Sequence, residues 1–370
     1  MTSYERMHLA MAHQKPDRVP VMCQLSLGYM EKHGGERPFD FYFNPESMAR
    51  ALMKTRRDLQ FDGVLLNVTF AENWAETYRS AQIEQVDGAE RYTLADGRVY
   101  EDRNQLLSLV YDPGRPPAPD IEDVDPDKVP LRLDYSNDMV LHRMVVEQGR
   151  REQVSVHGEI VSPLDCLCEL LGLENALMAM VLDGEKCKVL LERYVAQCVA
   201  FARAQIDVGV DAMKISSPYA GGSFISRPFY AQFVMPYERE VVRGIRAYAP
   251  HIPIYTHTCG FIGDRLELMA ESGIDGLECM DPPPLGNTRL EDAKATVGDR
   301  LFLKGNLDSV NVLLKVTPET LEPFVREMLR CGAPGGGYIL STACSVAPGV
   351  DPAVLRQLAV LAEKYGRYDG

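Results

Sequence analysis

The chain has 370 residues, of which 46% are hydrophobic and 25% are charged, as in an ordinary globular protein. Its formal net charge of -14 gives little electrostatic support for a nucleic-acid or anionic-membrane partner. The sequence contains neither a signal-peptide core nor the roughly 18 continuous apolar residues that a membrane span needs. We therefore expect a cytoplasmic protein without nucleic-acid or membrane partners; a homodimer is compatible with this composition.

Short apolar, β-rich runs alternate along the chain with longer segments of helical periodicity, which indicates parallel β/α units. The eight predicted strands are Val19–Gln24, Gly63–Val68, Val154–Ile160, Ala212–Ser216, Ile252–His257, Gly273–Glu278, Leu301–Gly305 and Gly337–Ser341. The predicted helices include Glu174–Phe201, Pro228–Ala247, Ile262–Ser272 and Pro318–Cys331. Eight strands close a (β/α)8 TIM barrel, so we predict an α/β fold with one barrel domain over residues 1–370.

Residues 81–130 interrupt the alternation after the second predicted strand. From 81 to 101 the pattern alternates around the turns Asp87-Gly88 and Asp96-Gly97, which predicts an inserted antiparallel hairpin. The proline-rich stretch from 112 to 129 predicts an extended surface crossover, because proline is disfavoured inside helices and sheets.

Three soft side chains follow predicted strands: His257 and Cys259 form a His-x-Cys pair, and Cys344 lies far downstream. Alternation along a strand places the first two on the same side of the chain. A Cys2His set suits Zn2+ and leaves one position open for substrate. Nine scattered cysteines fit reduced thiols and a metal site better than a disulfide framework. The alternative is that all three side chains are ordinary core residues.

Other residues at the strand ends are candidates for catalysis or binding. Glu278 ends a predicted strand and could supply a fourth, exchangeable oxygen ligand or a catalytic carboxylate; it could equally bind substrate or a neighbouring arginine. His157 and Glu159 alternate on one strand and are candidate catalytic residues, although a hydrogen-bonded interior pair explains them as well. Lys214 could bind a substrate anion or form a salt bridge.

Aromatic residues near the predicted barrel mouth could wall a substrate pocket or simply cover the core. The candidates for substrate binding are Tyr219, Phe224 and Trp74, with Phe70 nearby. The pair Cys166 and Cys168 lies at the start of an apolar helix, which favours a structural role.

Three segments resemble the uroporphyrinogen decarboxylase superfamily across almost the whole chain: residues 13–21, 304–308 and 336–340. The resemblance implies a (β/α)8 barrel that serves either decarboxylases or zinc-dependent corrinoid methyltransferases. Decarboxylases carry arginines in a Met-Arg-Gln-Ala-Gly-Arg segment after Pro-Val, but residues 22–29 contain none. Cys344 also stands where the decarboxylases have a histidine. Without those cations, binding an eight-carboxylate substrate would be costly.

His257, Cys259 and Cys344 match the His-x-Cys and distant Cys of the methyltransferase branch, and cobalamin-independent methionine synthase has a similar set that includes a Glu, matched here by Glu278. The resemblance implies Zn2+ as cofactor. The chain lacks an Asp-x-His-x-x-Gly cobalamin motif, so the corrinoid is expected on a partner protein.

We therefore predict a zinc-dependent methyltransferase that exchanges methyl between a corrinoid protein and a small O- or S-methyl substrate. A methoxylated aromatic, and thus O-demethylation, is favoured by the aromatic residues and the 16 methionines. The alternatives are a methylcobamide:thiol methyltransferase, a uroporphyrinogen-type decarboxylase and a non-enzymatic module that binds a corrinoid protein.

Overall fold

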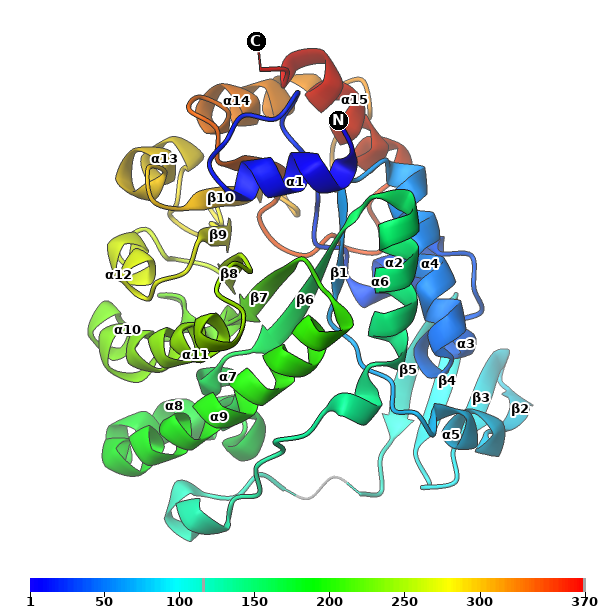
Figure 1. The fold of residues 1–370 in the computed structure, drawn as a ribbon. Helices are drawn as coiled ribbons and strands as arrows, with labels where there is room; N and C mark the ends of the chain where they lie inside the picture. The colour runs from blue at the N-terminus through cyan, green and yellow to red at the C-terminus, as the bar shows by residue number, and fades with distance from the viewer. Residues whose placement is uncertain (115–116, 369–370) are drawn as a thin grey trace.

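The computed structural model describes residues 1–114 and 117–368, and its centre is a curled parallel sheet (Figure 1). Seven strands are hydrogen-bonded in the order β1-β6-β7-β8-β9-β10-β11, and helices cover the outer side of the sheet. The strands are β1 (Gly63–Leu66), β6 (Ser155–Val161), β7 (Ala212–Ser216), β8 (Ile254–Thr258), β9 (Gly276–Cys279), β10 (Phe302–Leu307) and β11 (Tyr338–Thr342). All carboxyl ends of these strands therefore meet at one edge.

Several helices begin at a side-chain cap, among them those that follow Thr2 and Ser162. The helices are α1 (Ser3–Met11), α2 (Leu27–His33), α3 (Pro38–Phe43), α4 (Pro45–Leu59), α5 (Trp74–Ser80), α6 (Val140–Glu152), α7 (Pro163–Leu171), α8 (Leu173–Leu182), α9 (Gly184–Val208), α10 (Arg227–Phe233), α11 (Met235–Tyr248), α12 (Leu266–Glu271), α13 (Leu290–Val297), α14 (Glu322–Gly332) and α15 (Pro352–Tyr365). None of the helices in the described ranges is long and apolar enough to cross a membrane.

Two predicted helices are each divided into two. The helix predicted over 174–201 is α8 and α9, because Asp183 leaves helical geometry and its side chain caps Lys186 N. The helix predicted over 228–247 is α10 and α11, separated at Val234. Pro236 lies in the first turn of α11, where its missing N–H costs no intrahelical bond.

The first predicted strand, Val19–Gln24, is an irregular segment rather than a regular strand. It nevertheless bridges the two ends of the sheet. Leu340 N on β11 donates to Pro20 O at 2.9 Å, and Asp62 N, just before β1, donates to Val21 O at 2.7 Å. The segment also forms parallel bridges from Val21 to Leu340 and from Leu25 to Val346. Backbone hydrogen bonds thus continue from β11 through this segment toward β1.

An aspartate precedes three of the strands and binds the start of the neighbouring segment. Asp211 accepts from Val156 N at 2.7 Å, and Asp275 accepts from Ile254 N at 2.7 Å. Asp62 accepts from Val21 N at 2.8 Å in the same way. Each carboxylate satisfies a strand-start N–H that the ladder leaves free. The segment around Val21 is therefore held as a strand of the sheet would be.

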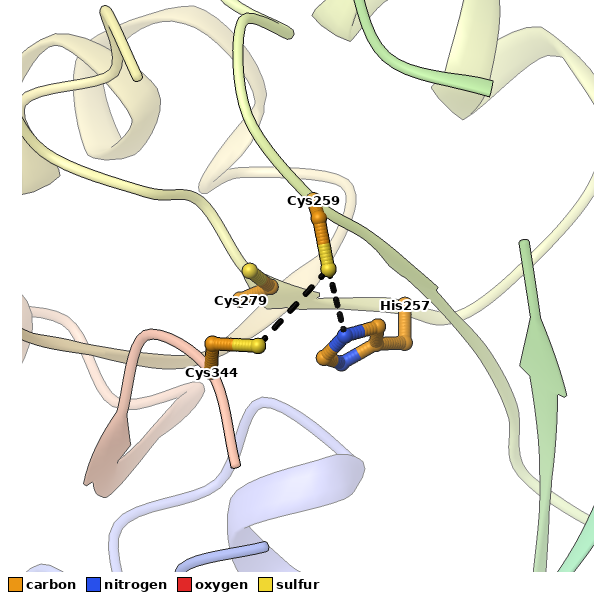
Figure 2. A group of neighbouring side chains, drawn as sticks. All are labelled: His257, Cys259, Cys279 and Cys344. Atoms are coloured by element: carbon orange, nitrogen blue, oxygen red, sulfur yellow. Dashed lines mark hydrogen bonds between the residues drawn. The ribbon is translucent and has the colours of Figure 1, made fainter. Parts of the chain in front are cut away.

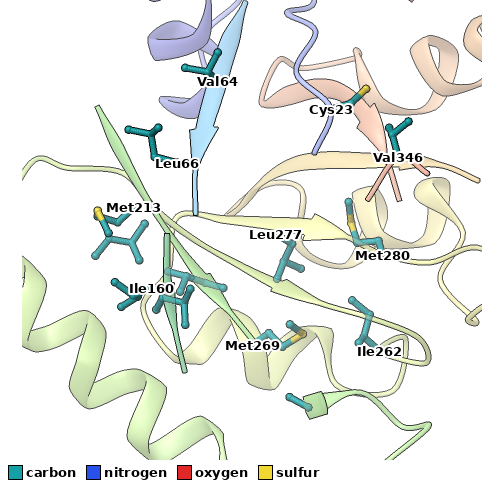
Figure 3. Close-up of a cluster of buried hydrophobic side chains, with 14 of the residues drawn as sticks. Cys23, Val64, Leu66, Ile160, Met213, Ile262, Met269, Leu277, Met280 and Val346 are labelled. Atoms are coloured by element: carbon teal, nitrogen blue, oxygen red, sulfur yellow. The ribbon is translucent and has the colours of Figure 1, made fainter. Parts of the chain in front are cut away.

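Helix α1 packs at the amino ends of the strands. Met7, Ala10 and Met11 form one buried cluster with strand residues that include Ala212 and Phe302. A larger core lies between the sheet and the outer helices; Figure 3 shows part of it, with Leu277 and Met269 among the labelled side chains.

The insertion after β1 is larger than the single hairpin predicted over 81–101. It is a four-stranded antiparallel sheet of β2 (Gln82–Val86), β3 (Ala89–Thr93), β4 (Val99–Arg103) and β5 (Leu106–Tyr111). The turn before β5 uses Asn104 and Gln105 at φ 56° and 62°, and without a glycine it was not recognisable in the sequence. The crossover predicted over 112–129 contains the 3-10 turns Ile121–Asp123 and Pro126–Lys128; residues 115–116 lie outside the described ranges.

The fold makes a testable prediction at Asp62, which is 1% exposed and paired with Arg6 at 2.6 Å and Arg18 at 2.9 Å. Asp62→Ala removes the carboxylate that joins α1, the Val21 segment and β1. We expect the free energy of unfolding in urea to fall by about 3–5 kcal/mol, because buried cations lose their partner.

The control is Asp58→Ala, which removes only an exposed pair with Lys54. It should change the free energy of unfolding by less than about 0.5 kcal/mol. Equal effects of the two substitutions would contradict the role of Asp62.

Candidate metal centre

Four soft side chains converge at the carboxyl edge of the sheet: His257, Cys259, Cys279 and Cys344 (Figure 2). His257 lies on β8, Cys259 directly follows that strand, Cys279 ends β9, and Cys344 follows β11. One ligand atom from each lies within 4.8 Å of all the others. The structure thus brings together the three residues that the sequence singled out and adds Cys279.

Two distances among His257, Cys259 and Cys344 are close to those between ligands of a tetrahedral zinc ion. The sulfurs of Cys259 and Cys344 are 3.7 Å apart, and His257 Nε2 lies 3.3 Å from the Cys259 sulfur. Zinc bonds of about 2.3 Å to sulfur and about 2.0 Å to nitrogen imply tetrahedral edges of about 3.8 Å and about 3.5 Å. Nitrogen and thiolate donors in this geometry are those that zinc prefers.

Glu278 lies behind His257 rather than in the group of four. One oxygen of its carboxylate is 3.0 Å from His257 Nδ1, on the opposite side of the ring from the sulfurs. A carboxylate at one ring nitrogen fixes the orientation of the imidazole and leaves the other nitrogen to bind metal. The ligand role predicted for Glu278 stays a prediction, and the contact observed in this structure is with His257 Nδ1.

Two buried lysines neutralise the charge around Glu278. Lys304 forms an ion pair with Glu278, and Lys214 lies 3.2 Å from Glu278 and 3.3 Å from Glu159. Burial opposes ionisation of Glu278, but Lys214, Lys304 and His257 lower its pKa well below the usual range. Burial lowers the pKa of Lys214, whereas Glu159 and Glu278 raise it by more. Two cations thus face two carboxylates inside the sheet.

The turn after β8 positions Cys259. Gly260 has φ 77°, in the left-handed region that glycine adopts without strain, and its N–H donates to Asp281 at 2.7 Å. A side chain on Gly221 would meet the Cys259 carbonyl oxygen at 2.0 Å, so the segment after β7 can pack this closely only with glycine there. These contacts hold the thiol beside His257.

Cys279 was missed because strand alternation places consecutive residues on opposite faces, and Glu278 was assigned to the site. The backbone at Cys279 has φ 83°, and this departure from strand geometry brings the Cys279 side chain into the group of four. The available signal was a second soft donor directly after a strand-end acid. Hydrogen bonds with Cys259 and Cys279 hold the pKa of Cys344 well below its usual range, whereas burial and the neighbouring thiols raise the pKa of Cys279.

The other candidate residues lie outside the group of four and make contacts of their own. His157 hydrogen-bonds to Tyr255 and Ser155, at 3.0 and 3.1 Å, and burial lowers its pKa to about 3. Lys214 forms the salt bridges that the sequence left as an alternative. Tyr219 and Phe224 follow β7 and pack edge to face, whereas Trp74 packs on Tyr78 within α5.

The family model for uroporphyrinogen decarboxylase (URO-D) matches residues 112–365. The chain belongs to this family. The resemblance predicted from three short segments is thereby confirmed.

Relatives that match over the full length carry methyltransferase names. The methylcobamide:CoM methyltransferase MtbA of Methanosarcina mazei is 21% identical, and that of Methanosarcina acetivorans 22%, each over 99% of both chains. The uroporphyrinogen decarboxylase of Alkalilimnicola ehrlichii is 32% identical, but over only 44% of this chain and 42% of its own length. The chain is thus an enzyme of the methyltransferase branch of the superfamily.

Solved structures agree on the fold. A methyltransferase from Methanosarcina mazei superposes with a TM-score of 0.73 at 19% identity, covering 99% of each chain. A B12-independent methionine synthase from Shewanella sp. W3-18-1 superposes with a TM-score of 0.53 at 12% identity. At these identities the likeness concerns the fold alone.

The contacts of Glu278 make a testable prediction. Glu278→Gln removes the charge that orients His257 and balances two buried lysines. We expect zinc affinity, measured by chelator competition, to fall by about 10–100-fold, as for other residues that orient metal ligands. The exposed Glu267→Gln on α12 is the control and should leave affinity unchanged. Wild-type affinity in Glu278→Gln would contradict the orienting role.

Proposed function

We propose that this protein is a zinc-dependent methyltransferase that moves a methyl group between a small substrate and a corrinoid protein. The observation that carries the proposal is the group of four nitrogen and sulfur donors at the carboxyl edge of the sheet. In barrel enzymes this edge holds the active site. The names of the full-length relatives support methyl transfer with a methylcobamide.

The donors divide into a buried and an accessible part. His257 and Cys279 are buried, whereas Cys259 and Cys344 are partly exposed, so substrate would approach on the side of these two sulfurs. Zinc bound here would lower the pKa of a substrate thiol or polarise an ether oxygen. Glu278 would keep His257 in place during this step through its contact with Nδ1.

A methoxylated aromatic remains our favoured substrate, and the reaction would then be O-demethylation. Tyr219 and Phe224 form an aromatic pair directly after β7, with ring centroids 5.4 Å apart. Lys214 and Lys304, the buried lysines near Glu278, are paired with carboxylates and so are not free to bind an anionic substrate. Both features favour a neutral aromatic compound.

A thiol is the second candidate, because the full-length relatives are named methylcobamide:CoM methyltransferases. In that direction the substrate sulfur would take the methyl group and leave Co(I) on the corrinoid, and zinc held by these residues would lower the pKa of the substrate thiol. Decarboxylation has less support. Residues 22–29 supply no arginine, and Gln24 in that segment is bound to Lys214 at 2.8 Å.

We infer that the corrinoid protein docks at the carboxyl edge of the sheet. Four exposed apolar side chains, Phe224, Phe261, Val310 and Leu314, lie on segments that follow β7, β8 and β10. Exposed apolar side chains around an active site are typical of a protein contact. They would bring the corrinoid toward Cys259 and Cys344.

We also propose that residues 19–25 occupy the eighth strand position, so that a single (β/α)8 barrel spans residues 1–370. Its backbone bonds to Leu340 and Asp62 support this closure. Cytoplasmic location and a homodimer stay predictions of the sequence.

The first experiment measures zinc and methyl transfer together. Wild type should contain about one zinc per chain, and His257→Ala should lose it, because a structural nitrogen ligand is removed. Wild type with cob(I)alamin should demethylate at least one member of a methoxyarene panel.

Transfer from methylcobalamin to thiols alone would replace the favoured substrate with the second candidate. Release of carbon dioxide from uroporphyrinogen would contradict methyl transfer. Freshly purified wild type without metal would contradict the zinc centre.

The docking surface predicts a selective defect. Phe261→Asp should lower kcat/KM by about tenfold, or about 1.4 kcal/mol, with a corrinoid protein as methyl partner, because it places a charge in an apolar contact. Turnover with free cobalamin should stay at the wild-type value. Val360→Asp, at an equally exposed apolar position on α15, is the control. Equal losses with protein-bound and free cobalamin would contradict docking at this edge.

A further inference from the structure

Strand β9 ends in an unusual backbone conformation at the metal centre. Cys279 has φ 83° and Met280 has φ 56°, and both are non-glycine residues in the left-handed region. Such residues are strained and persist where surrounding contacts enforce the conformation. Strained residues of this kind cluster at functional sites.

Two neighbouring segments, β10 and the segment after β8, hold the turn. Asn306 on β10, 2% exposed, donates to Met280 O at 2.8 Å and to Thr288 O at 3.0 Å. Asp281 accepts from Gly260 N at 2.7 Å and thereby links the turn to the segment of Cys259. Gly305 allows β10 to approach, because a side chain there would meet Cys279 O at 2.7 Å.

The turn changes the direction of one side chain. In a regular strand, Glu278 and Cys279 would point to opposite faces. Here Glu278 contacts His257 Nδ1, while the sulfur of the next residue lies within 4.8 Å of the ligand atoms of His257, Cys259 and Cys344. Cys279 is fully buried, and Figure 2 shows its thiol beside those of Cys259 and Cys344. A thiol that merely fills the core needs no such turn.

We propose that Cys279 is a third thiolate ligand, so that the site in the absence of substrate is Cys3His rather than the Cys2His set with a Glu278 oxygen that the sequence predicted. This inference rests on the zinc centre of the proposed function. Protein donors then close the coordination sphere, as in four-ligand zinc sites. Glu278 orients His257 from the second side of the ring.

The test counts thiolates in the full-length protein loaded with Co2+ in place of zinc. Wild type should show the near-ultraviolet sulfur-to-cobalt charge-transfer intensity of three thiolates. Cys279→Ala should lose about one third of it, like Cys344→Ala, because each removes one of three sulfur ligands. Cys187→Ala, at an equally buried cysteine on α9, should keep the full intensity.

Zinc K-edge X-ray absorption of wild type gives an answer even if Cys279→Ala fails to fold. Three sulfurs and one nitrogen around zinc would support the inference. Two sulfurs with two nitrogen or oxygen neighbours would overturn it and leave the zinc centre of the proposed function intact. A wild type that binds neither Co2+ nor zinc would overturn both.

Discussion

The arrangement of the candidate metal centre depends on the buried carboxylate of Glu278. It contacts His257 of β8, Lys214 of β7 and Lys304 of β10, and so joins three strands to its own. A buried charge is tolerated only when it is paired and hydrogen-bonded. Here two lysine cations pair with the carboxylate, and an imidazole forms a hydrogen bond with it. The imidazole is thereby held with Nε2 toward the sulfurs, which makes a metal-binding geometry possible before any ion arrives.

The parallel sheet explains how distant parts of the sequence supply one site. Cys259 and Cys344 are 85 residues apart, yet both follow strands whose carboxyl ends meet at the same edge. Aspartates at the opposite ends of the strands, among them Asp211 and Asp275, bind the strand starts and set their register. The aspartates that bind strand starts lie at the amino edge and the candidate ligands at the carboxyl edge, which is the active-site edge in barrel enzymes.

Elements with a clear local signal were predicted from the sequence, and elements without one were missed. The strands that bear the candidate ligands were predicted close to their observed bounds, because short apolar runs between helical segments are distinctive. The insertion was underestimated because the turn at Asn104 and Gln105 has no glycine. The helix predicted across Asp183 is two helices, because Asp183 caps the start of the second one. The sequence did not show whether Asp183 starts a new helix or lies inside one long helix.

The sequence by itself determined the alternation of strands and helices, the His257-x-Cys259 pair with Cys344, and the family resemblance, since these depend on residue type and spacing along the chain. Only the tertiary structure decided that Glu278 binds the far side of His257 and that Cys279 joins the cluster. The reason is physical. The position of Cys279 depends on a left-handed turn that bonds from Asn306 and Gly260 help to hold, and the contact of Glu278 depends on the pairing of β8 with β9. Such bonds between separate segments have no signature in local sequence.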